Sequence, residues 1–333
     1  MNRIGGLFAQ IRDPANLTIA LAAAARGKRS QPDVVRFLRD ADRQLGEIAR
    51  QLSGDSFDFQ PYREFDVHDT KSRTIRAPTF RDRVVHHALI NVIGEVLERS
   101  ASNHSYACRK GFGQHAALRQ ARSWTRRTLW YGKMDFRKYY DSVNHDLLRF
   151  RLNRRFSEKP LLRLLDALLD SWSSQPGLGL PIGALTSQYL GNFFLDQFDA
   201  QMQRSGLCHR YVRYMDDIVV WNEPQRMATI RELAISTATE LKLEIKHSGE
   251  WNACQFGVPF LGFVIYPDRL RMGRQARRRL RRKLRTLRRH HDKGLLSDLD
   301  YQARLTSLFA HGLIADDGNW RKSVLECQKF TSE

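Results

Sequence analysis

Residues 211–220 read Tyr-Val-Arg-Tyr-Met-Asp-Asp-Ile-Val-Val, so two adjacent aspartates separate two short β-branched and aromatic runs. Val, Ile and Tyr favour strands and Asp favours turns, which predicts a tight β-hairpin with Asp216 and Asp217 at its turn. Adjacent carboxylates repel each other, and a divalent cation shared with a third carboxylate relieves that repulsion. Oxygen-only ligation of this kind suits Mg²⁺. For this dipeptide alone a solvated turn is the simpler interpretation, and the rest of the chain decides between the two.

A strong excess of basic residues narrows the class of partner. The 333 residues include 55 Lys and Arg against 36 Asp and Glu, which gives a formal net charge of +19. Basic surfaces gain free energy when they neutralise phosphates and release counterions, so we expect a nucleic-acid partner. No apolar stretch approaches the roughly 20 residues that span a bilayer, and we expect no membrane partner.

The cysteines and the N-terminus indicate the expected compartment. Cys108, Cys208, Cys254 and Cys327 lie far apart and form no C-x-x-C pair, so we expect reduced thiols without a metal. The N-terminus lacks a charged segment followed by a long apolar one, which argues against secretion. We therefore expect a cytoplasmic protein.

Hydrophobic periodicity divides the chain into helices and strands. Residues 13–53 predict two helices joined by a basic loop, and residues 62–75 predict an extended hairpin with Lys71 to Arg73 at its tip. The other expected elements are helices at 80–97, 185–203 and 225–241, a helical pair at 145–173, strands at 129–135 and 241–247, a Pro/Gly-rich loop at 177–183 and a hairpin around 260–266. Because helices and antiparallel hairpins are mixed, we expect an α+β fold rather than a doubly wound sheet.

Residues 269–291 form the densest basic tract of the chain. Leu280, Leu284 and Leu287 recur within it at helical spacing, so one face can pack while the others present guanidinium groups. An ordinary solvated helix is one interpretation, but crowded like charges cost helix stability unless an anion compensates them. Nucleic-acid contact is the stronger explanation. The arginines expected to make it are Arg274, Arg277, Arg278, Arg281, Arg282 and Arg285.

A third carboxylate completes a candidate catalytic set. Asp135 ends the apolar strand predicted at 129–135, where a backbone carbonyl can also reach a metal. With Asp216 and Asp217 it supplies three carboxylates for two-metal phosphoryl transfer. Lys71 and Arg73 are cations suited to triphosphate oxygens. Each Asp alone is more often a turn or cap residue, and their joint occurrence with these cations favours the catalytic interpretation.

With the aspartate pair at 216–217, Asp135 at a strand end and the cations Lys71 and Arg73, the sequence resembles the bacterial reverse transcriptases related to those of group II introns. The resemblance covers about residues 60–270, with the motifs in the family's order. Tyr214-Met-Asp-Asp217 resembles motif C, Met134-Asp135-Phe-Arg-Lys-Tyr-Tyr140 resembles motif A, Pro181-Ile-Gly-Ala-Leu-Thr-Ser187-Gln188 resembles motif B, Phe260-Leu-Gly-Phe263 resembles the turn after motif D, and Lys71-Ser-Arg73 resembles the fingers motif that holds the triphosphate.

Motif B refines the resemblance. Group II intron enzymes usually show Gln-Gly followed by Ser-Pro, whereas this chain has Ile182-Gly183 and Ser187-Gln188. That pattern is similar to the reverse transcriptases of diversity-generating retroelements and implies error-prone copying at template adenines. Ile182 cannot donate a hydrogen bond, so checking of the nascent base pair should be weakened. Simple packing of a loop is the alternative explanation for Ile182.

The resemblance also implies roles for single residues. Asp135 and Asp216 are the expected principal ligands of two Mg²⁺ ions, for which Mn²⁺ is an acceptable substitute, with Asp217 and the Phe136 backbone in support. Tyr140 stands at the position of the steric gate that favours deoxynucleotides. The residues expected to contact the incoming deoxynucleotide are Lys71, Arg73, Phe136, Tyr140, Ile182, Gly183 and Gln188. Lys246 is a candidate proton donor to pyrophosphate, although an exposed lysine at a strand end is the commoner case.

The resemblance implies a right-hand polymerase. We expect an N-terminal helical extension over 1–60, fingers and palm over 61–268, and a short basic helical thumb over 269–333. The implied activity is RNA-directed DNA synthesis by a bacterial or phage-encoded enzyme. Its expected partners are a template RNA, a primer or cDNA strand, deoxynucleotides and a small basic accessory protein, which could be oligomeric. A phage-defence or retron-like reverse transcriptase and a non-catalytic RNA-binding relative are the alternatives.

Overall fold

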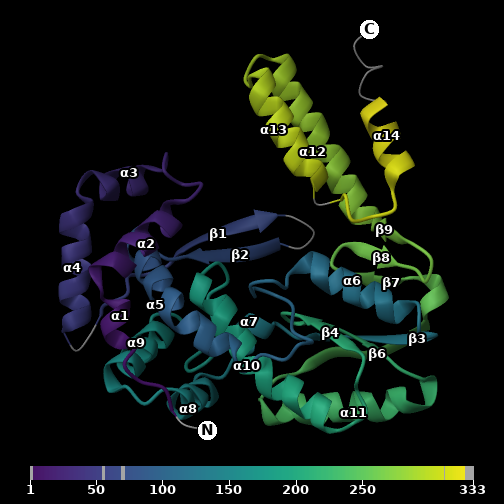
Figure 1. The fold of residues 1–333 in the computed structure, drawn as a ribbon, viewed down its shortest axis with the longest axis horizontal. Helices are drawn as coiled ribbons and strands as arrows, with labels where there is room; N and C mark the ends of the chain where they lie inside the picture. The colour runs from purple at the N-terminus through teal and green to yellow at the C-terminus, as the bar shows by residue number, and fades with distance from the viewer. Residues whose placement is uncertain (1–2, 55–56, 69–71, 311, 327–333) are drawn as a thin grey trace. The chain divides into compact units, whose positions relative to one another are not determined.

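The chain divides into two units whose segments alternate along the sequence (Figure 1). The first unit comprises Met1–Arg109, Asp135–Gly206 and Glu232–His247, and the second comprises Lys110–Met134, Leu207–Arg231 and Ser248–Glu333. The computed structural model describes residues 3–54, 57–68, 72–310 and 312–326. Three elements contain residues of both units: β3 (Trp130–Phe136), α11 (Pro224–Glu240) and β6 (Ile245–Ala253).

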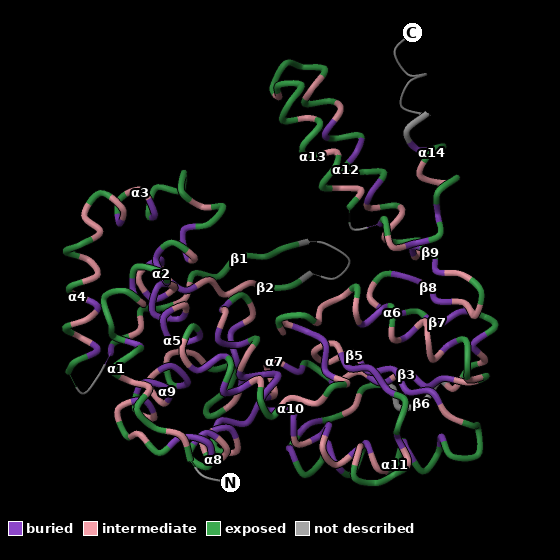
Figure 2. The backbone as a smooth tube through the Cα atoms, viewed as in Figure 1, coloured by how far each residue is buried: buried purple, intermediate pink, exposed green. Residues whose placement is uncertain are grey.

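The first unit is mostly helical and is built around α5 (Phe80–Glu98). The remaining elements of this unit are α1 (Phe8–Ile11), α2 (Pro14–Ala25), α3 (Pro32–Arg39), α4 (Ala41–Ser53), α7 (Tyr139–Ser142), α8 (His145–Arg155), α9 (Lys159–Asp170), α10 (Leu185–Arg204) and the antiparallel hairpin of β1 (Arg63–His68) and β2 (Ser72–Ala77). α1, α2, α3 and α10 pack against α5. Figure 2 shows the resulting core as buried positions along α5 and α10.

Local sequence signals account for several helix starts in this unit. The Asp13 carboxylate caps α2 by accepting from the backbone N–H of Ala15 at 2.8 Å, and Pro14 follows it at the first helical position. The Thr79 hydroxyl accepts from the N–H of Asp82 and begins α5. The Asn144 side chain begins α8 in the same way. These caps place the elements close to where the sequence predicts them.

The predicted count of two helices over residues 13–53 is wrong, because the structure has three there. Pro32 starts α3 at its first turn, as proline is suited to do. Asp40 then interrupts the helical path with φ −134° and ψ 41°, and α4 begins at the next residue. The periodicity continues across this break, which is why the sequence pattern alone reads as one helix.

The second unit contains two sheets. A four-stranded sheet has the order β4-β5-β3-β6, and a three-stranded antiparallel sheet has the order β7-β8-β9. The elements of this unit are α6 (Gln114–Thr125), β4 (Tyr211–Tyr214), β5 (Asp217–Trp221), a short 3₁₀ turn (Cys254–Phe256), β7 (Val258–Phe260), β8 (Phe263–Ile265), β9 (Leu270–Met272), α12 (Arg274–Asp292), α13 (Asp298–Ala310) and α14 (Gly318–Glu326). Helix α6 packs against strands of both sheets, namely β4, β5 and β8.

The expected mixture of helices and antiparallel hairpins is confirmed. The expected strand at 241–247 begins later, at Ile245, because Lys242 adopts a left-handed conformation (φ 55°) at the end of α11. The hairpin around 260–266 is confirmed, with a two-residue loop of Leu261 and Gly262 that both have positive φ. In the part of the chain that the structure describes, no helix is both long enough and apolar enough to cross a bilayer.

Candidate active site

The hairpin of β4 and β5 carries the adjacent aspartates. Its register pairs Tyr214 with Asp217, so Met215 and Asp216 alone form the loop. Asp217 is therefore the first residue of a strand rather than a turn residue, which corrects the predicted placement. Met215 has φ 55°, a conformation that is uncommon outside glycine and that clusters at functional sites.

A buried guanidinium supports this turn. Arg213 is fully buried, and its Nη1 donates to the carbonyl of Met215 at 3.1 Å. A charge in the interior is costly unless hydrogen-bonded, so this contact contributes to holding the loop carbonyl in one position. The sequence shows Arg213 inside an apolar strand, but the pattern alone does not reveal that it points back at the turn.

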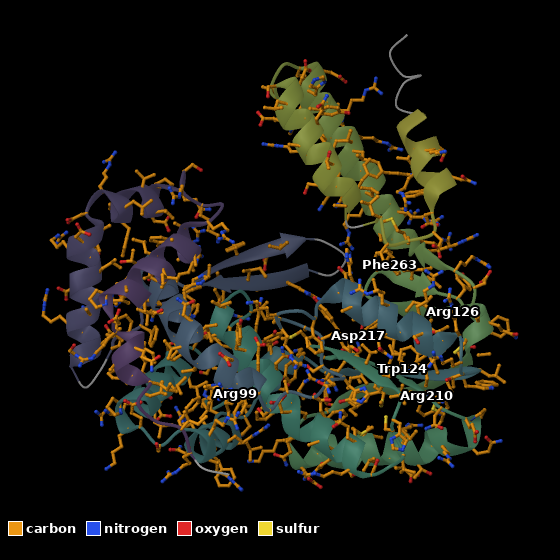
Figure 3. The ribbon with its side chains drawn as sticks, in the orientation of Figure 1. Arg99, Trp124, Arg126, Arg210, Asp217 and Phe263 are labelled. Carbon is orange, nitrogen blue, oxygen red and sulfur yellow. The ribbon has the colours of Figure 1, made fainter. Side chains whose placement is uncertain are left out.

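Lys133 on β3 forms an ion pair with Asp217. Its Nζ lies 3.1 Å from Asp217 Oδ1 and 3.3 Å from the carbonyl oxygen of Pro259. The Lys133 side chain is 36% exposed and the Asp217 side chain, which is labelled in Figure 3, is 25% exposed. Because both are partly exposed, the ion pair adds little to stability, but it does orient the Asp217 carboxylate. Sequence reasoning missed Lys133, although a lysine between the buried residues Gly132 and Met134 was a usable signal.

Asp135 lies near the end of β3 and belongs to the first unit, whereas Asp216 and Asp217 belong to the second. Its carboxylate is half-buried, and among the described residues no cation lies within ion-pair distance of it. The next residue, Phe136, is buried against the ring of Phe198 at 5.3 Å, which anchors the strand end. Within the described chain, no group of three or more His, Cys, Asp or Glu side chains is arranged to hold a metal.

Strand β2 contacts the loop that precedes α10. The N–H of Arg76 donates to the carbonyl of Ile182 at 2.7 Å. Gly183 has φ 117°, and a Cβ at that position would lie 2.7 Å from Ile75 Cγ2 and 3.1 Å from the Arg76 carbonyl oxygen. Only glycine fits this close approach. The structure thus brings the predicted Ile182 and Gly183 against the strand that carries Arg73.

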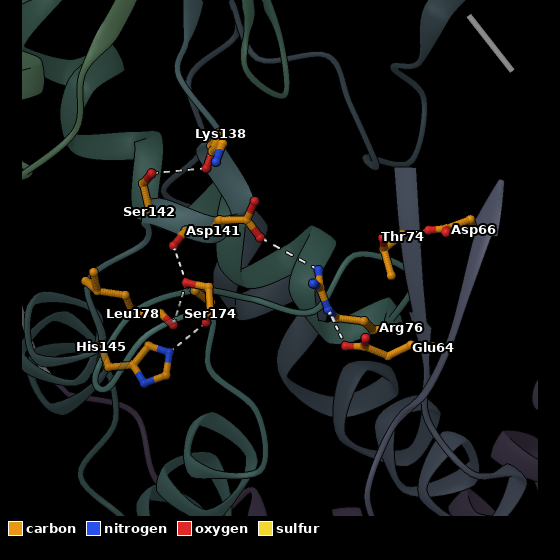
Figure 4. A network of polar contacts seen from close by, with 11 residues as sticks. Glu64, Asp66, Thr74, Arg76, Lys138, Asp141, Ser142, His145, Ser174 and Leu178 are labelled. Atoms are coloured by element: carbon orange, nitrogen blue, oxygen red, sulfur yellow. Dashed lines mark hydrogen bonds and ion pairs between the residues drawn. The ribbon is translucent and has the colours of Figure 1, made fainter. Parts of the chain in front are cut away.

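The Arg76 side chain connects strand β2 to helix α7 as well. Its guanidinium lies 2.8 Å from Glu64, the cross-strand neighbour on β1, and 3.7 Å from Asp141 of α7 (Figure 4). It also lies over the Trp172 ring, 4.4 Å from the centroid. Sequence reasoning missed Arg76 because none of these partners is adjacent to it in the chain. Arg73, three residues earlier on β2, is exposed, and Lys71 lies outside the described residues.

The candidate steric gate rests on α10. Tyr139 is buried, and its hydroxyl donates to the carbonyl of Gly191 at 2.5 Å. The adjacent Tyr140 is half-exposed, and its carbonyl accepts from the N–H of Leu180 at 2.7 Å. A Cβ on Gly191 would lie 3.4 Å from the Tyr139 ring and 3.7 Å from the Tyr140 ring, so the missing side chain lets both tyrosines lie close to the helix. Tyr140 is therefore positioned by its neighbours and still reachable by a ligand.

The first turns of α10 hold two further contacts. Gln188 is exposed, and its Oε1 accepts from Cys108 Sγ at 3.3 Å. Thr186 is buried and hydrogen-bonds His86 Nδ1 of α5 at 2.9 Å. Burial, reinforced by His87 and Arg83, lowers the pKa of His86 to about 3, so this imidazole is neutral near pH 7. Cys108 thus contacts Gln188, one of the predicted site residues.

The basic tract of residues 269–291 is helical from Arg274 onward, as α12, whereas Leu270–Met272 at its start form β9. Leu280, Leu284 and Leu287 are buried, and α12 packs against α13. Five of the six arginines predicted to contact nucleic acid are exposed, namely Arg274, Arg278, Arg281, Arg282 and Arg285. Arg277 is half-buried, and its Nη2 lies 2.6 Å from the buried Asp317. The Arg277 guanidinium also lies 5.0 Å from the Trp320 ring centroid, so it contributes to packing within the unit.

Comparison with known proteins identifies the family. Residues 66–265 match the family described as "Reverse transcriptase (RNA-dependent DNA polymerase)", and this range is more than half of the 333 residues. The chain belongs to the reverse transcriptase family. The matched range extends from β1 to β8 and includes Asp135, Asp216 and Asp217, whereas α12 follows it.

Individual relatives of this chain are distant. It is 26% identical over 164 residues to the COX1/OXI3 intron 1 protein of Saccharomyces cerevisiae, a match that covers 46% of this chain and 20% of that protein. It is 21% identical over 168 residues to the group II intron-encoded protein LtrA of Lactococcus lactis subsp. cremoris, covering 48% of this chain and 28% of that protein. A solved partial Cas6-RT-Cas1–Cas2 complex aligns with a TM-score of 0.41 and 20% identity, covering 70% of this chain and 41% of that one. The matches thus span less than a third of the length of the two sequence relatives.

Proposed function

We propose that this chain is an RNA-directed DNA polymerase that adds deoxynucleotides to a primer 3′-hydroxyl. The observation that carries the proposal is the hairpin of β4 and β5. Its two-residue loop presents Asp216, Arg213 holds that loop, and Lys133 orients the neighbouring Asp217. The family match over residues 66–265 supports the same chemistry.

Carboxylate oxygens on Asp135 and Asp216 are the proposed principal ligands of two Mg²⁺ ions, which would activate the 3′-hydroxyl and stabilise the leaving pyrophosphate when bound. The donor chemistry fits, because the Asp135 carboxylate has no ion-pair partner among the described residues. The Phe136 carbonyl is a further proposed ligand. Asp217 supports the set and is already partly neutralised by Lys133. Mn²⁺, which accepts the same oxygen ligands, is the proposed substitute.

The proposed nucleotide site lies in the first unit. Arg73 and Lys71 would bind triphosphate oxygens, and Tyr140 would exclude a 2′-hydroxyl from the sugar position. Ile182, Gly183 and Gln188 would line the base and sugar. The contact between β2 and the 182–183 loop supports this grouping, since it places the strand of Arg73 against two of the other proposed residues.

We further propose a mutagenic role of the kind found in diversity-generating retroelements. The support is the aliphatic side chain of Ile182, whose backbone carbonyl is already taken by Arg76. The aliphatic side chain neither donates nor accepts a hydrogen bond, and the carbonyl oxygen already accepts one from Arg76, so neither group checks a nascent base pair by hydrogen bonding, which weakens discrimination. The proposed partners are a template RNA and a small basic accessory protein, with α12 contacting the nucleic-acid backbone through its exposed arginines.

Primer extension on a defined RNA template tests the activity. The full chain is supplied with four deoxynucleotides or four ribonucleotides in Mg²⁺, with and without the Tyr140→Ala change. We expect deoxynucleotide extension by the unchanged chain, and measurable ribonucleotide extension once the ring is removed. An Asp42→Asn variant, which removes an exposed carboxylate on α4, serves as the control and should extend normally. RNA binding with no extension under any condition would instead favour the non-catalytic alternative.

A fidelity measurement tests the mutagenic role. Products made by the unchanged chain and by Ile182→Asn are sequenced. Misincorporation concentrated opposite adenine, and reduced by the substitution, is the expected result. Equal and accurate copying by both would leave a reverse transcriptase of another purpose.

A further inference from the structure

An open cavity of about 770 Å³ lies within the first unit, and none of its lining residues is among the proposed nucleotide residues. Its lining comes from β2, from the segment that follows Asp135, from the loop before Leu178 and from the turn after α11. The lining residues are Arg76, Arg137, Lys138, Asp141, Ser142, Asn144, Ser174, Gln175, Leu178, Lys242 and Glu244. Leu178 is the one apolar side chain among them, so the cavity suits a polar ligand.

Both carboxylates of the lining are already engaged by arginines. Figure 4 shows the contact between Asp141 and Arg76. These side chains lie 3.7 Å apart, and Glu244 lies 3.0 Å from Arg137. The Arg137 backbone N–H also donates to the Glu244 carbonyl at 2.8 Å, which ties the two segments together. Arg137 is thus paired with Glu244, and Arg76 is shared between Asp141 and Glu64, which lies 2.8 Å from it outside the lining.

Lys138 and Lys242 are the remaining cations of the lining. Both are exposed, and no carboxylate of the described chain lies within ion-pair distance of either. Both also adopt left-handed backbone conformations, with φ 44° and φ 55°. Such conformations cost a non-glycine residue on the order of 1 kcal/mol and persist only where the surroundings impose them.

The surroundings do impose them here. The Lys138 carbonyl accepts from the N–H of Asp141 at 2.9 Å and from the Ser142 hydroxyl at 3.1 Å. The N–H of Lys242 donates to the carbonyl of Thr239 at 2.9 Å. The backbone therefore fixes the origin of both lysine side chains at the cavity, where each adds a positive charge that no carboxylate of the described residues neutralises.

We propose that this cavity binds phosphate groups through Lys138 and Lys242, as a second anion site beside the proposed nucleotide residues. The inference rests on the proposed function, which supplies phosphate from two sources: free oligophosphate, such as the released pyrophosphate, and the backbone of single-stranded RNA. The volume exceeds that of one phosphate group and admits either. A charged ammonium group binds phosphate oxygens as a compact point charge, which both sources satisfy.

Two binding measurements on the full chain test the site at constant pH. Calorimetry measures the affinity for inorganic tripolyphosphate, and fluorescence anisotropy measures the affinity for a labelled twelve-nucleotide RNA at several salt concentrations. The test variant is Lys138→Gln with Lys242→Gln, and the conservative variant replaces both lysines with Arg. The control variant is Lys159→Gln with Lys322→Gln, which loses the same charge from exposed positions outside the cavity.

The Gln pair should weaken binding about tenfold, which corresponds to ~1.4 kcal/mol, while the Arg pair and the control stay within about twofold of the unchanged chain. Loss for tripolyphosphate alone assigns the site to free oligophosphate. Loss for RNA alone, with the salt slope reduced by about 1.4 for two phosphates, assigns it to the RNA backbone. Unchanged affinity of the Gln pair for both ligands, or equal losses in the control, overturns the proposal. Neither measurement needs synthesis, so the site can fail while the polymerase proposal stands, and the reverse.

Discussion

The carboxylate of Asp217, the second aspartate of the hairpin, is oriented by an ion pair with Lys133. Lys133 Nζ lies 3.1 Å from Asp217 Oδ1, and the pair is partly exposed. We predict that Lys133→Met lowers kcat for primer extension about tenfold by releasing the carboxylate, with a stability change below about 1 kcal/mol. Lys133→Arg should recover most of the rate because it restores the charge. Equal kcat in the Met variant and the unchanged chain would remove Lys133 from the site.

Gly183 is a second residue whose role follows from geometry. An Ala there would place its Cβ 2.7 Å from Ile75 Cγ2 on a backbone with φ 117°. We predict that Gly183→Ala destabilises the protein by about 2 kcal/mol and raises KM for deoxynucleotides, because the loop must move away from β2. Urea unfolding and steady-state extension measure the two effects. Gly46→Ala is the matched control, since nothing lies within 4 Å of its Cβ, and it should raise stability by about 1 kcal/mol.

Single residues also show where sequence reasoning reaches its limit. The turn at Asp216 was predicted from local residue preferences, and Gly183 was expected in the nucleotide site from the resemblance of its segment to motif B. Arg76 and Lys133 were not, because their partners Asp141 and Asp217 are 65 and 84 positions away along the chain. A local pattern carries no information on which distant carboxylate a basic side chain meets.

At the scale of elements, α12 combines two roles that its sequence does not separate. Arg277 pairs with the buried Asp317, whereas Arg278, Arg282 and Arg285 are exposed. We predict that replacing the three exposed arginines with Gln weakens RNA binding and lowers the salt slope by about 2, without loss of stability. Arg277→Gln should instead destabilise the protein, because it leaves the Asp317 carboxylate buried without its partner. Anisotropy measures RNA affinity and thermal unfolding measures stability for both variants. If the two variants lose affinity and stability alike, the exposed arginines and Arg277 do not have separate roles.

Elements with strong local signals were predicted closely. The predicted helix at 185–203 is observed as Leu185–Arg204. The two β-branched and aromatic runs of the predicted hairpin form β4 and β5, and the turn lies between them. Helix α6 was missed because its sequence, Gln-His-Ala-Ala-Leu-Arg-Gln-Ala-Arg-Ser-Trp-Thr, has a narrow buried face of Ala117, Leu118 and Ala121. Small residues leave a weak hydrophobic pattern, and only the packing of α6 on both sheets shows that it is an element of the core.

At the scale of the whole molecule, one buried imidazole links stability to pH. Burial lowers the pKa of His86 to about 3, so the folded protein binds this proton only well below the pH at which the unfolded chain does. The stabilising contribution is therefore complete above pH ~6.5 and is lost as pH falls toward 3. We predict a loss of about 2 kcal/mol of unfolding free energy between pH 7 and pH 5 from this group. His86→Asn, which keeps a polar group near Thr186, should flatten the profile, and parallel profiles would disprove the assignment.

We propose that Asp135 and Asp216 carry metal-dependent synthesis on an RNA template. The most direct measurement is primer extension by the unchanged chain, Asp135→Asn and Asp216→Asn, with RNA affinity determined on the same preparations. We predict that each Asn variant loses synthesis by about a thousandfold or more while its RNA affinity stays within about twofold, since only the metal ligands are altered. Synthesis that persists in either variant at a rate comparable to that of the unchanged chain would show that the replaced carboxylate is not an essential metal ligand.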